Sequence, residues 1–378
     1  MKVLQVIDNL ALGGAEVLLT QLHPRFRERG IDCEYYLLQP DNGVLEQKLR
    51  FQGAQIHTPL QSSVRSPLHI GALRSHLRRF AYDIVHVHLF PAQLWASLAV
   101  RNTPAASALV TTEHSTSNGR RKNWLRALDR QIYAPYKRIV CISAAVSASL
   151  VQWLPQLSDR VTVITNGIDI DAFASAAPLD KAAAFGVPEG TPVVLSVGRL
   201  SPIKDHMTML RAMSLVPELH LAIVGSGSLD AKLRALARDL GVSQRVHFLG
   251  RRMDVPQLLR AADIYVQSSL WEGFGIAALE AMASGLPVVA SQVPGLADVV
   301  ADAGLLFPSQ NPERLAECLR LLLHDSELRK RLSHAAQERA KQYSIDRTRD
   351  CYEQLYREML AKGAAFRERT KPQEKYPE

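Results

Sequence analysis

Two glutamates that flank a glycine-rich turn are the residues of this sequence best suited to bind a ligand. Glu272 and Glu280 enclose the segment EGFGIAALE, which follows an apolar run ending near Gln267 and opens a helical pattern. Gly273 and Gly275 let backbone N–H groups approach a ligand closely, and a helix N-terminus favours phosphate. A carboxylate can accept one hydroxyl of a diol on each oxygen. The segment predicts a site for a phosphate-bearing polyol, with both glutamates on one side of the helix, Glu272 at its mouth and Glu280 deeper.

Two cations follow a second apolar run. Gly198 and Arg199 end this run, and Lys204 lies five residues further in a short loop. Arginine binds phosphate as a bidentate fork, whereas lysine acts as a mobile point charge. At the carboxyl end of a strand, the pair can neutralise a leaving diphosphate without a metal ion. No CxxC pair occurs among the four cysteines, so the sequence signals neither a zinc site nor a redox dithiol.

A glycine pair in the first half resembles the start of the glutamate-bearing helix. Gly13 and Gly14 follow the apolar run Val3–Ile7 and precede a helical pattern from Ala15. Free N–H groups and little side-chain bulk are therefore expected at this turn. The following Glu16 is best explained as a first-turn carboxylate that the helix dipole favours.

Three histidines also lie near strand ends in the first half. His86 and His88 are two residues apart on a strand, so their side chains point to the same face. His114 ends another apolar run within the sequence TTEH. With no third metal ligand evident beside His86 and His88, we expect a polar cleft wall there and no metal site.

Apolar β-branched runs alternate with amphipathic helical patterns throughout the chain. This alternation predicts parallel sheets joined by right-handed crossovers, an α/β fold. The expected strands are Lys2–Ile7, Asp83–Val87, Ala108–Thr112, Arg138–Ile142 and Val161–Ile164 in the first half, and Pro192–Val197, His220–Val224, Arg245–Phe248, Ile264–Gln267, Pro287–Ala290 and Gly304–Phe307 in the second.

The 378 residues suffice for two hydrophobic cores. A stretch over 171–190 has no clear strand and contains helix-breaking residues, so we place the domain boundary there. The expected division is a first domain over 1–170, a second over 171–345, and a final segment over 346–378. That segment contains an amphipathic helix, expected to return to the first domain, and a polar tail.

Four of these segments together resemble the retaining glycosyltransferases of family four, also called group 1, which have the GT-B fold. They are LGGAE at 12–16, TNGID at 165–169, SVGRLSPIKD around Arg199 and Lys204, and EGFGIAALEAMASGLPVVAS from Glu272. Their order and spacing match the family over most of the chain. The resemblance implies two Rossmann-like domains whose parallel sheets face an interdomain cleft, with the donor in the second domain.

The resemblance also implies residue roles. Glu280 would hold the ribose hydroxyls, Glu272 the hydroxyls of the donor sugar, and Arg199 and Lys204 the diphosphate. His114 would face the donor sugar and would act in catalysis with Glu272, Arg199 and Lys204. The full donor set would be Gly14, Gly198, Arg199, Lys204, Arg251, Met253, Glu272, Gly273, Phe274, Gly275, Ile276 and Glu280, and the acceptor side would hold Gly13, Gly14, His88 and His114.

A basic segment in the first half points to an anionic surface. The formal charge of the chain is +8, and residues 1–170 contain 19 Lys and Arg against 12 Asp and Glu. Residues 120–132 read as a basic amphipathic helix with Trp124 among its apolar side chains. Such a helix can rest on anionic lipid headgroups or pack on its own sheet. No nucleic-acid-binding module accompanies it, so no nucleic-acid partner is expected.

The function expected from these observations is transfer of a sugar from a UDP- or GDP-linked donor to a glycan or lipid-linked acceptor, with retained anomeric configuration. Bacterial surface polysaccharide synthesis is the expected setting, and no cofactor or metal is needed. The alternatives are a nucleotide-sugar epimerase on a similar fold and a non-catalytic carbohydrate- or membrane-binding protein. Scattered cysteines and no visible secretory signal favour the cytoplasm, with peripheral contact to the inner face of the cell membrane.

Overall fold

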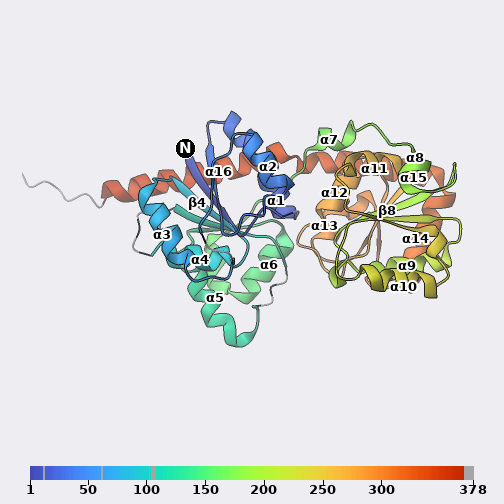
Figure 1. Cartoon of the computed structure of the whole chain (residues 1–378), viewed down its shortest axis with the longest axis horizontal. Coiled ribbons are helices and arrows are strands. Elements are labelled where there is room, and N and C mark those ends of the chain that lie inside the picture. Colours follow the sequence, from blue (N-terminus) through green and yellow to red (C-terminus); the bar gives the residue numbers. More distant parts are fainter. Residues whose placement is uncertain are drawn as a thin grey trace, which may run out of the picture. The chain divides into compact units, whose positions relative to one another are not determined.

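The chain folds into two compact α/β units (Figure 1). The computed structural model describes residues 1–369 except 12, 61–62, 102, 104–107, 117 and 119, and it describes side chains up to residue 361. The first unit consists mainly of Met1–His114, Asn118–Thr165 and the C-terminal segment from Asp346. The second consists mainly of Asn166–Ile345. The boundaries expected from the sequence are 170/171 and 345/346, the first of them five residues after the observed change at 165/166.

The first unit is built on a seven-stranded parallel sheet with the order β3-β2-β1-β4-β5-β6-β7. Its core is made of apolar strand residues such as Val3, Leu4 and Val6, none of which is exposed to solvent. Because helices cover both faces, these strands are continuously apolar. The strands are β1 (Lys2–Ile7), β2 (Asp32–Leu37), β3 (Ile56–His57), β4 (Ile84–His88), β5 (Leu109–Glu113), β6 (Arg138–Cys141) and β7 (Val161–Val163).

Two strands of this sheet, β2 and β3, were not expected from the sequence. β2 reads DCEYYL, and its charged residues hide the strand pattern. Glu34 of β2 is nevertheless buried, because its carboxylate accepts hydrogen bonds from Tyr82 at 2.6 Å and is paired with Lys2 at 2.7 Å. β3 has only two residues, too few for any periodic signal.

The helices of the first unit connect its parallel strands. Contacts join α1 to α2 and join α3 and α5 to α4, so these helices form separate groups around the sheet. They are α1 (Gly14–Glu28), α2 (Val44–Phe51), α3 (His69–Arg79), α4 (Ala92–Ala99), η2 (Asn123–Leu125), α5 (Arg126–Tyr133), α6 (Ala144–Trp153) and η3 (Pro155–Arg160).

The second unit has a six-stranded parallel sheet with the order β10-β9-β8-β11-β12-β13. Each expected strand of this half is present within one or two residues of its predicted bounds. The strands are β8 (Val193–Val197), β9 (His220–Val224), β10 (Val246–Gly250), β11 (Ile264–Gln267), β12 (Val288–Ser291) and β13 (Leu305–Phe307).

Two groups of helices cover this second sheet, with α9, α10 and α14 in one and α7, α11, α12, α13 and α15 in the other (Figure 1). The elements are α7 (Ile170–Ala174), α8 (Lys181–Phe185), η4 (Pro202–Lys204), α9 (His206–Leu215), α10 (Asp230–Asp239), η5 (Ser243–Arg245), α11 (Val255–Ala261), α12 (Ile276–Ala283), α13 (Leu296–Val300), η6 (Ala301–Ala303), α14 (Pro312–His324), α15 (Ser326–Ala340) and η7 (Lys341–Tyr343).

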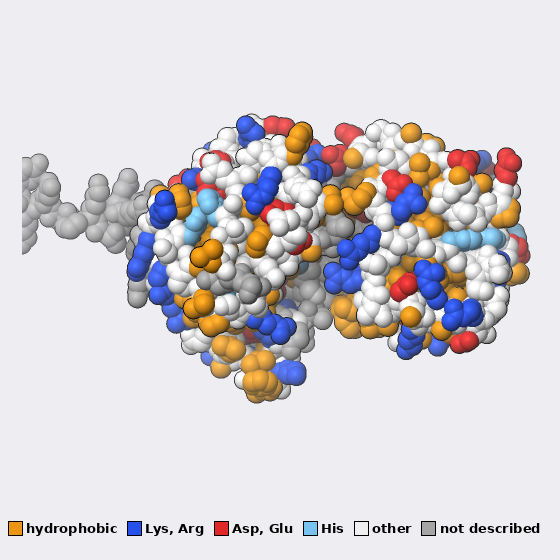
Figure 2. Space-filling view, in the orientation of Figure 1, with side chains coloured by type: hydrophobic (Ala, Val, Ile, Leu, Met, Phe, Trp, Pro, Cys, Tyr) orange, Lys and Arg blue, Asp and Glu red, His pale blue; other side chains and the backbone are white. Residues whose placement is uncertain are grey.

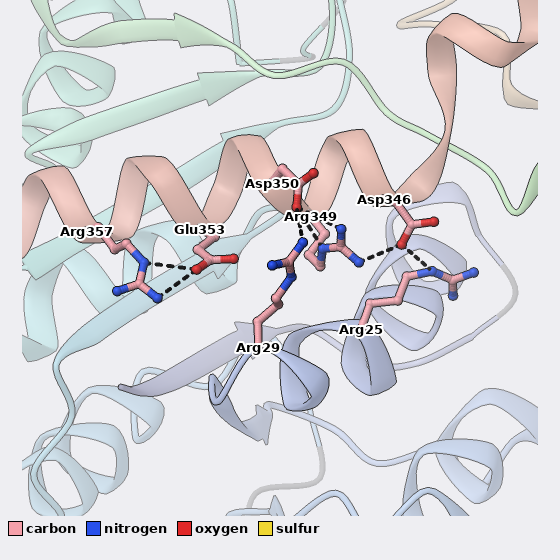
Figure 3. A network of polar contacts seen from close by, with 7 residues as sticks. All are labelled: Arg25, Arg29, Asp346, Arg349, Asp350, Glu353 and Arg357. Carbon is pink, nitrogen blue, oxygen red and sulfur yellow. Dashed lines mark hydrogen bonds and ion pairs between the residues drawn. The ribbon is translucent and has the colours of Figure 1, made fainter.

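The last helix, α16 (Ile345–Arg369), packs on α1 of the first unit. Figure 3 shows an ion-pair network along this contact, in which Asp346 faces Arg25 and Asp350 faces Arg29. These arginine–aspartate distances are 3.4 and 3.6 Å, and both aspartate side chains are 54% exposed. Exposed pairs of this kind add little to stability. The network therefore affects the orientation of α16 on α1 more than the free energy of their association.

Aromatic contacts supply the buried part of the same interface. Phe26 of α1 lies 6.5 Å from the ring of Tyr352 and 6.1 Å from that of Tyr356, and all three are at most 2% exposed. Burial of large aromatic side chains dominates the energetics of such contacts. We therefore attribute the docking of α16 chiefly to these rings.

This division of roles predicts a contrast between two substitutions. Phe26→Ala should lower the free energy of unfolding of the first unit by about 3–5 kcal/mol, because it leaves a buried cavity. Asp350→Asn should lower it by about 1 kcal/mol or less, because the Asp350 carboxylate is half exposed and its more buried partner, Arg349, keeps its ion pair with Asp346. Urea unfolding followed by circular dichroism measures both. Equal losses for the two variants would contradict the assignment.

Candidate active site

In each sheet, the candidate residues lie at the carboxyl ends of the two strands where the strand order reverses. Both orders reverse direction at a central pair of strands, β1 and β4 in the first sheet and β8 and β11 in the second. Loops that leave the carboxyl ends of such a pair diverge to opposite faces, and open α/β sheets bind ligands in that crevice. Lys204 follows β8 and Glu272 follows β11, whereas Gly13 follows β1 and His88 ends β4.

In the second unit, one carboxylate oxygen accepts hydrogen bonds from three side chains of the candidate site. Oε1 of Glu272 accepts hydrogen bonds from Lys204 Nζ at 2.5 Å, Gln267 Nε2 at 2.6 Å and Ser269 Oγ at 2.6 Å. The side chain of Glu272 is 13% exposed and that of Lys204 is 25% exposed. Because all three donors use the same oxygen, Oε2 remains available for a ligand.

Further bonds hold the two loops of this site together. Ser268 Oγ donates to the carbonyl of Asp205 at 2.8 Å, and the N–H of Leu270 donates to the carbonyl of Ile203 at 2.7 Å. The aliphatic part of Lys204 packs over Gly198, where an added Cβ would lie 3.5 Å from Lys204 Cε. The loops that carry Lys204 and Glu272 are therefore held together by hydrogen bonds and packing.

Sequence reasoning did not find Gln267 and Ser269. Gln267 is the last residue of β11 and is only 3% exposed, and its amide oxygen accepts from the hydroxyl of Tyr265 at 3.2 Å. This leaves the amide N–H₂ directed at Glu272. A glutamine at the end of the otherwise apolar strand IYVQ was the available signal, since a buried polar side chain needs a partner.

Glu272 lies at the mouth of the helix and Glu280 lies within it. α12 begins at Ile276, so Glu272 lies in the preceding loop and only Glu280 lies in the helix. Gly275 causes this, because its φ of 101° suits glycine and stops the helix from extending backwards. An added Cβ at Gly275 would also collide with Leu296 Cδ1 at 2.8 Å.

Glu280 differs from Glu272 in having no partner of its own. Within the described part of the chain, no side chain or N–H bonds its carboxylate. Burial raises the pKa of Glu280 to about 7, because no nearby donor stabilises the charged form. A carboxylate in this state gains two donors when it meets a diol.

The other predicted donor residues fall into two groups. Arg199 is exposed, and within the described residues its guanidinium has no partner. Arg251 is exposed and donates to Ser226 Oγ at 2.8 Å, and Met253 is 62% exposed. These three side chains are accessible to a ligand.

Phe274 belongs to the fold more than to the ligand surface. It is 3% exposed, and its ring lies 5.5 Å from that of Tyr343 in an edge contact. Only its backbone can reach a ligand, together with the backbone of Gly273 and the half-buried Ile276 at the start of α12. The predicted role of Phe274 is thus reduced to its main chain.

In the first unit, the glycine turn opens α1 as expected. Gly13 is its N-cap and Gly14 its first residue, and Glu16 lies in the first turn. The carboxylate of Glu16 lies directly over Gly13, where an added Cβ would collide with Oε2. Leu12, the first residue of the LGGAE motif, is outside the described residues.

His86 and His88 are more buried than the side chains of a polar cleft wall would be. His86 and His88 are 1% and 2% exposed, with ring centroids 4.2 Å apart on the same face as predicted. His88 Nδ1 lies 3.3 Å from Nε2 of His114, which is partly exposed. Burial lowers the pKa of His86 to about 3 and of His114 to about 4, and holds that of His88 well below its usual range. All three are therefore neutral at physiological pH.

Asp8 is a further polar residue at this edge that sequence reasoning passed over. It directly follows β1, and its Oδ1 accepts the N–H of Ala92 at the start of α4 at 2.9 Å. Burial raises its pKa to about 6. An aspartate between an apolar strand and a glycine pair was the signal for it.

The basic segment is only partly the predicted helix. α5 begins at Arg126, and Arg120 precedes it with a side chain 12% exposed, in an ion pair with Asp129 at 3.1 Å. The Arg120 side chain points into the unit because the buried carboxylate of Asp129 is stable only when it is paired with a cation. Trp124 and Leu128 remain 76% and 48% exposed.

Comparison with known proteins identifies the fold and the family. The model of glycosyl transferases group 1 matches residues 180–339, and that of glycosyltransferase family 4 matches residues 12–172. A D-inositol 3-phosphate glycosyltransferase of Salinispora arenicola is 33% identical over 326 residues, which cover 77% of this chain and 72% of the relative. The chain belongs to the family 4, group 1 glycosyltransferases.

Solved structures agree on the GT-B arrangement of this glycosyltransferase. A glycosyltransferase from Rickettsia africae has a TM-score of 0.81 at 21% identity, covering 95% of this chain and 98% of its own. HepE from Anabaena, solved with UDP and glucose, has a TM-score of 0.81 at 23% identity, covering 94% and 99%. The predicted α/β class and family are confirmed.

Two features are absent from the residues that the structure describes. No group of three or more His, Cys, Asp or Glu side chains in this part of the glycosyltransferase is arranged to hold a metal ion. Among the helices of the described residues, none combines the length and the apolar character needed to cross a bilayer.

The state of Glu280 predicts a pH dependence of nucleotide binding. A ribose diol donates to the ionised carboxylate, so binding lowers the pKa from about 7 and releases a proton. Affinity should therefore rise as pH rises, by about tenfold between pH 6 and pH 8. Calorimetry with a nucleoside diphosphate measures this.

Glu280→Gln is the comparison that isolates the carboxyl group, because the diphosphate itself titrates near pH 6. Glu338→Gln, at an exposed position paired with Lys341, serves as the matched control. The pH slope should flatten only in Glu280→Gln. An unchanged slope in that variant would reject the assignment.

Proposed function

We propose that this glycosyltransferase moves a sugar from a UDP- or GDP-linked donor to a glycan or lipid-linked acceptor with retention of configuration and without a metal. The observation that supports this most directly is the cluster around Glu272. A largely buried carboxylate with three donors on one oxygen and an adjacent cation lies at the switch point of one sheet. The helix that follows carries Glu280, which has no partner among the described residues.

Each part of a nucleotide sugar has a complementary group in this cluster. Glu280 offers two acceptor oxygens to the ribose diol. The N-terminus of α12 and the cations Lys204 and Arg199 suit the diphosphate. Oε2 of Glu272 is left for a hydroxyl of the donor sugar.

The reaction then needs a change of partner by Lys204. In the present structure its ammonium pairs with Glu272, whereas the departing diphosphate carries more negative charge than one carboxylate. As the bond between the anomeric carbon and the phosphate oxygen breaks, Lys204 and Arg199 stabilise the charge that develops there. The acceptor hydroxyl forms the new bond on the same face and gives its proton to the leaving phosphate.

The names of the similar proteins suggest which donors and acceptors to assay first. HepE was solved with UDP and glucose, and the Salinispora relative is named for D-inositol 3-phosphate. We propose a UDP-sugar as the first donor to assay, with D-inositol 3-phosphate and lipid-linked glycans of bacterial surface polysaccharide synthesis as candidate acceptors. Incubation of the donor alone, followed by a search for its epimer, separates transfer from epimerisation.

Removal of Lys204 tests the proposed chemistry. Lys204→Ala should lower kcat/KM by about 10²–10³-fold, a typical effect of losing one group that stabilises transition-state charge. Lys181→Ala is the matched control, because Lys181 also pairs with a carboxylate, Asp263, at 2.8 Å but lies beside the amino ends of the strands. Initial rates of nucleoside diphosphate release, with and without EDTA, give the answer. Equal rates for the two variants, or loss of activity in EDTA, would count against the proposal.

We also propose that the tip formed by η2 and α5 rests on an anionic bilayer. Trp124 and Leu128 are exposed there beside the exposed cations Lys122, Arg126 and Arg130. Figure 2 shows hydrophobic and basic side chains together at this end of the first unit. The acidic residue of the segment, Asp129, is buried against Arg120 and Trp153, so the exposed residues of η2 and α5 include no carboxylate that anionic headgroups would repel.

Vesicle sedimentation tests the proposed surface. Trp124→Ser combined with Leu128→Ser should reduce binding to vesicles that contain anionic lipid at least fivefold, and high salt should weaken binding by the wild-type protein. Phe51→Ser is the matched control, because Phe51 is 94% exposed on α2 of the same unit. Equal binding by both variants would place the lipid contact elsewhere.

A further inference from the structure

A continuous chain of hydrogen bonds leads to His114 through the interior of the first unit. Gln5 on β1 lies with its Oε1 2.9 Å from His88 Nε2. His88 Nδ1 in turn lies 3.3 Å from His114 Nε2. Gln5 and His88 are 1% and 2% exposed, so water does not replace either contact. The three side chains come from β1, β4 and the end of β5.

The amide nitrogen of Gln5 leads into a second branch of the network. Gln5 Nε2 donates to the hydroxyl of Tyr356 on α16 at 3.4 Å. This hydroxyl lies 2.6 Å from His86 Nδ1, and His86 Nε2 lies 2.7 Å from Thr112 Oγ1. If the hydroxyl accepts from Gln5, its own proton is directed at His86 Nδ1, and His86 carries its proton on Nε2. Each neutral group in this branch donates and accepts once along the path.

These directions determine where the protons of the other two histidines lie. Because Gln5 directs its carbonyl oxygen at His88, His88 must carry its proton on Nε2. Its Nδ1 is then a lone-pair acceptor, and the 3.3 Å contact requires that His114 carry its proton on Nε2. A neutral imidazole has one N–H, so Nδ1 of His114 is unprotonated.

We propose that Gln5 and His88 are positioning residues that hold His114 in the Nε2–H tautomer, so that its Nδ1 accepts a hydrogen bond from a hydroxyl of the bound sugar. Nδ1 is the nitrogen left for such a contact, because within the described residues nothing else bonds it and His114 is partly exposed. The contact to a sugar rests on the proposed function, whereas the tautomer does not.

The arrangement gives α16 a part in the site. Tyr356 is fully buried, and its hydroxyl lies 3.4 Å from Gln5 Nε2 and 2.6 Å from His86 Nδ1. The orientation of one amide in β1 thus depends on a helix about 350 residues later in the chain. Such fully bonded polar networks are rigid, since no member can rotate without leaving a buried group unpaired.

Nitrogen NMR of the protein without substrate tests the tautomer directly. In the wild-type protein labelled at the 12 histidines, long-range ¹H–¹⁵N spectra should show a protonated Nε2 and an unprotonated Nδ1 for both His88 and His114. Spectra of His88→Asn and His114→Asn assign the signals by their loss. A protonated Nδ1 on His114 would overturn the proposal, whether or not sugar transfer has been found.

A variant of Gln5 tests the cause. Gln5→Met keeps the side-chain length but removes the acceptor for His88, so the His114 signals should shift toward an average of the two tautomers. With donor and acceptor present, kcat/KM should fall about tenfold, the effect of one misplaced hydrogen bond. Tyr352→Phe is the matched control, because it keeps the ring contacts of this buried α16 residue with His86 and Tyr356 and removes only the hydroxyl, which lies 3.3 Å from Thr112 Oγ1.

The outcomes separate the two levels of the proposal. Unchanged His114 signals in Gln5→Met would refute the positioning role. Shifted signals with unchanged kinetics, in a protein that does transfer sugar, would refute the contact between Nδ1 and the substrate. If no transfer is found with any acceptor, the proposed function fails, and the wild-type spectra still decide the tautomer.

Discussion

The second unit depends on one constraint, the convergence of three donors on a single oxygen of Glu272. Ammonium, amide and hydroxyl groups lie 2.5–2.6 Å from Oε1. A carboxylate that is largely withdrawn from water is stable only when its charge is neutralised and its lone pairs are used. Here the loops after β8 and β11 must meet to satisfy it, so the charge that would make the unit unstable also locks its binding loops together.

The first unit places neutral groups at the corresponding edge. The low pKa values of His86, His88 and His114 follow from burial, and neutral rings allow the hydrogen-bond chain from Gln5 to run in one direction. If the proposed function holds, the difference between the cations of the second unit and the neutral histidines of the first serves the reaction. Cations near Lys204 suit a departing diphosphate, whereas an additional positive charge at His114 would oppose the positive charge that develops at the anomeric carbon.

The sequence predicted the class of fold, every strand of the second sheet and the family, because long apolar runs and four spaced motifs report those directly. It missed β2, whose Glu34 looks like a surface residue until Lys2 and Tyr82 are brought to it from other elements. It found Glu272 and Lys204 but not Gln267 or Ser269, since nothing local reveals that three donors share one oxygen. It also included Arg120 in a basic amphipathic helix, although α5 begins only at Arg126, because the buried pairing of Arg120 with Asp129 cannot be read from a charge pattern.

The strand orders explain why these residues could be located before their contacts were known. In each sheet the order reverses between the first strand and the fourth, and the loops at that reversal diverge. Topology alone therefore fixes the place for Asp8, Gly13 and His88 in one unit and for Lys204 and Glu272 in the other. It does not fix the chemistry, which belongs to the side chains set on those loops. A different residue at 267 or 5 would leave both sheets intact, but Glu272 or His88 would lose the partner that orients it.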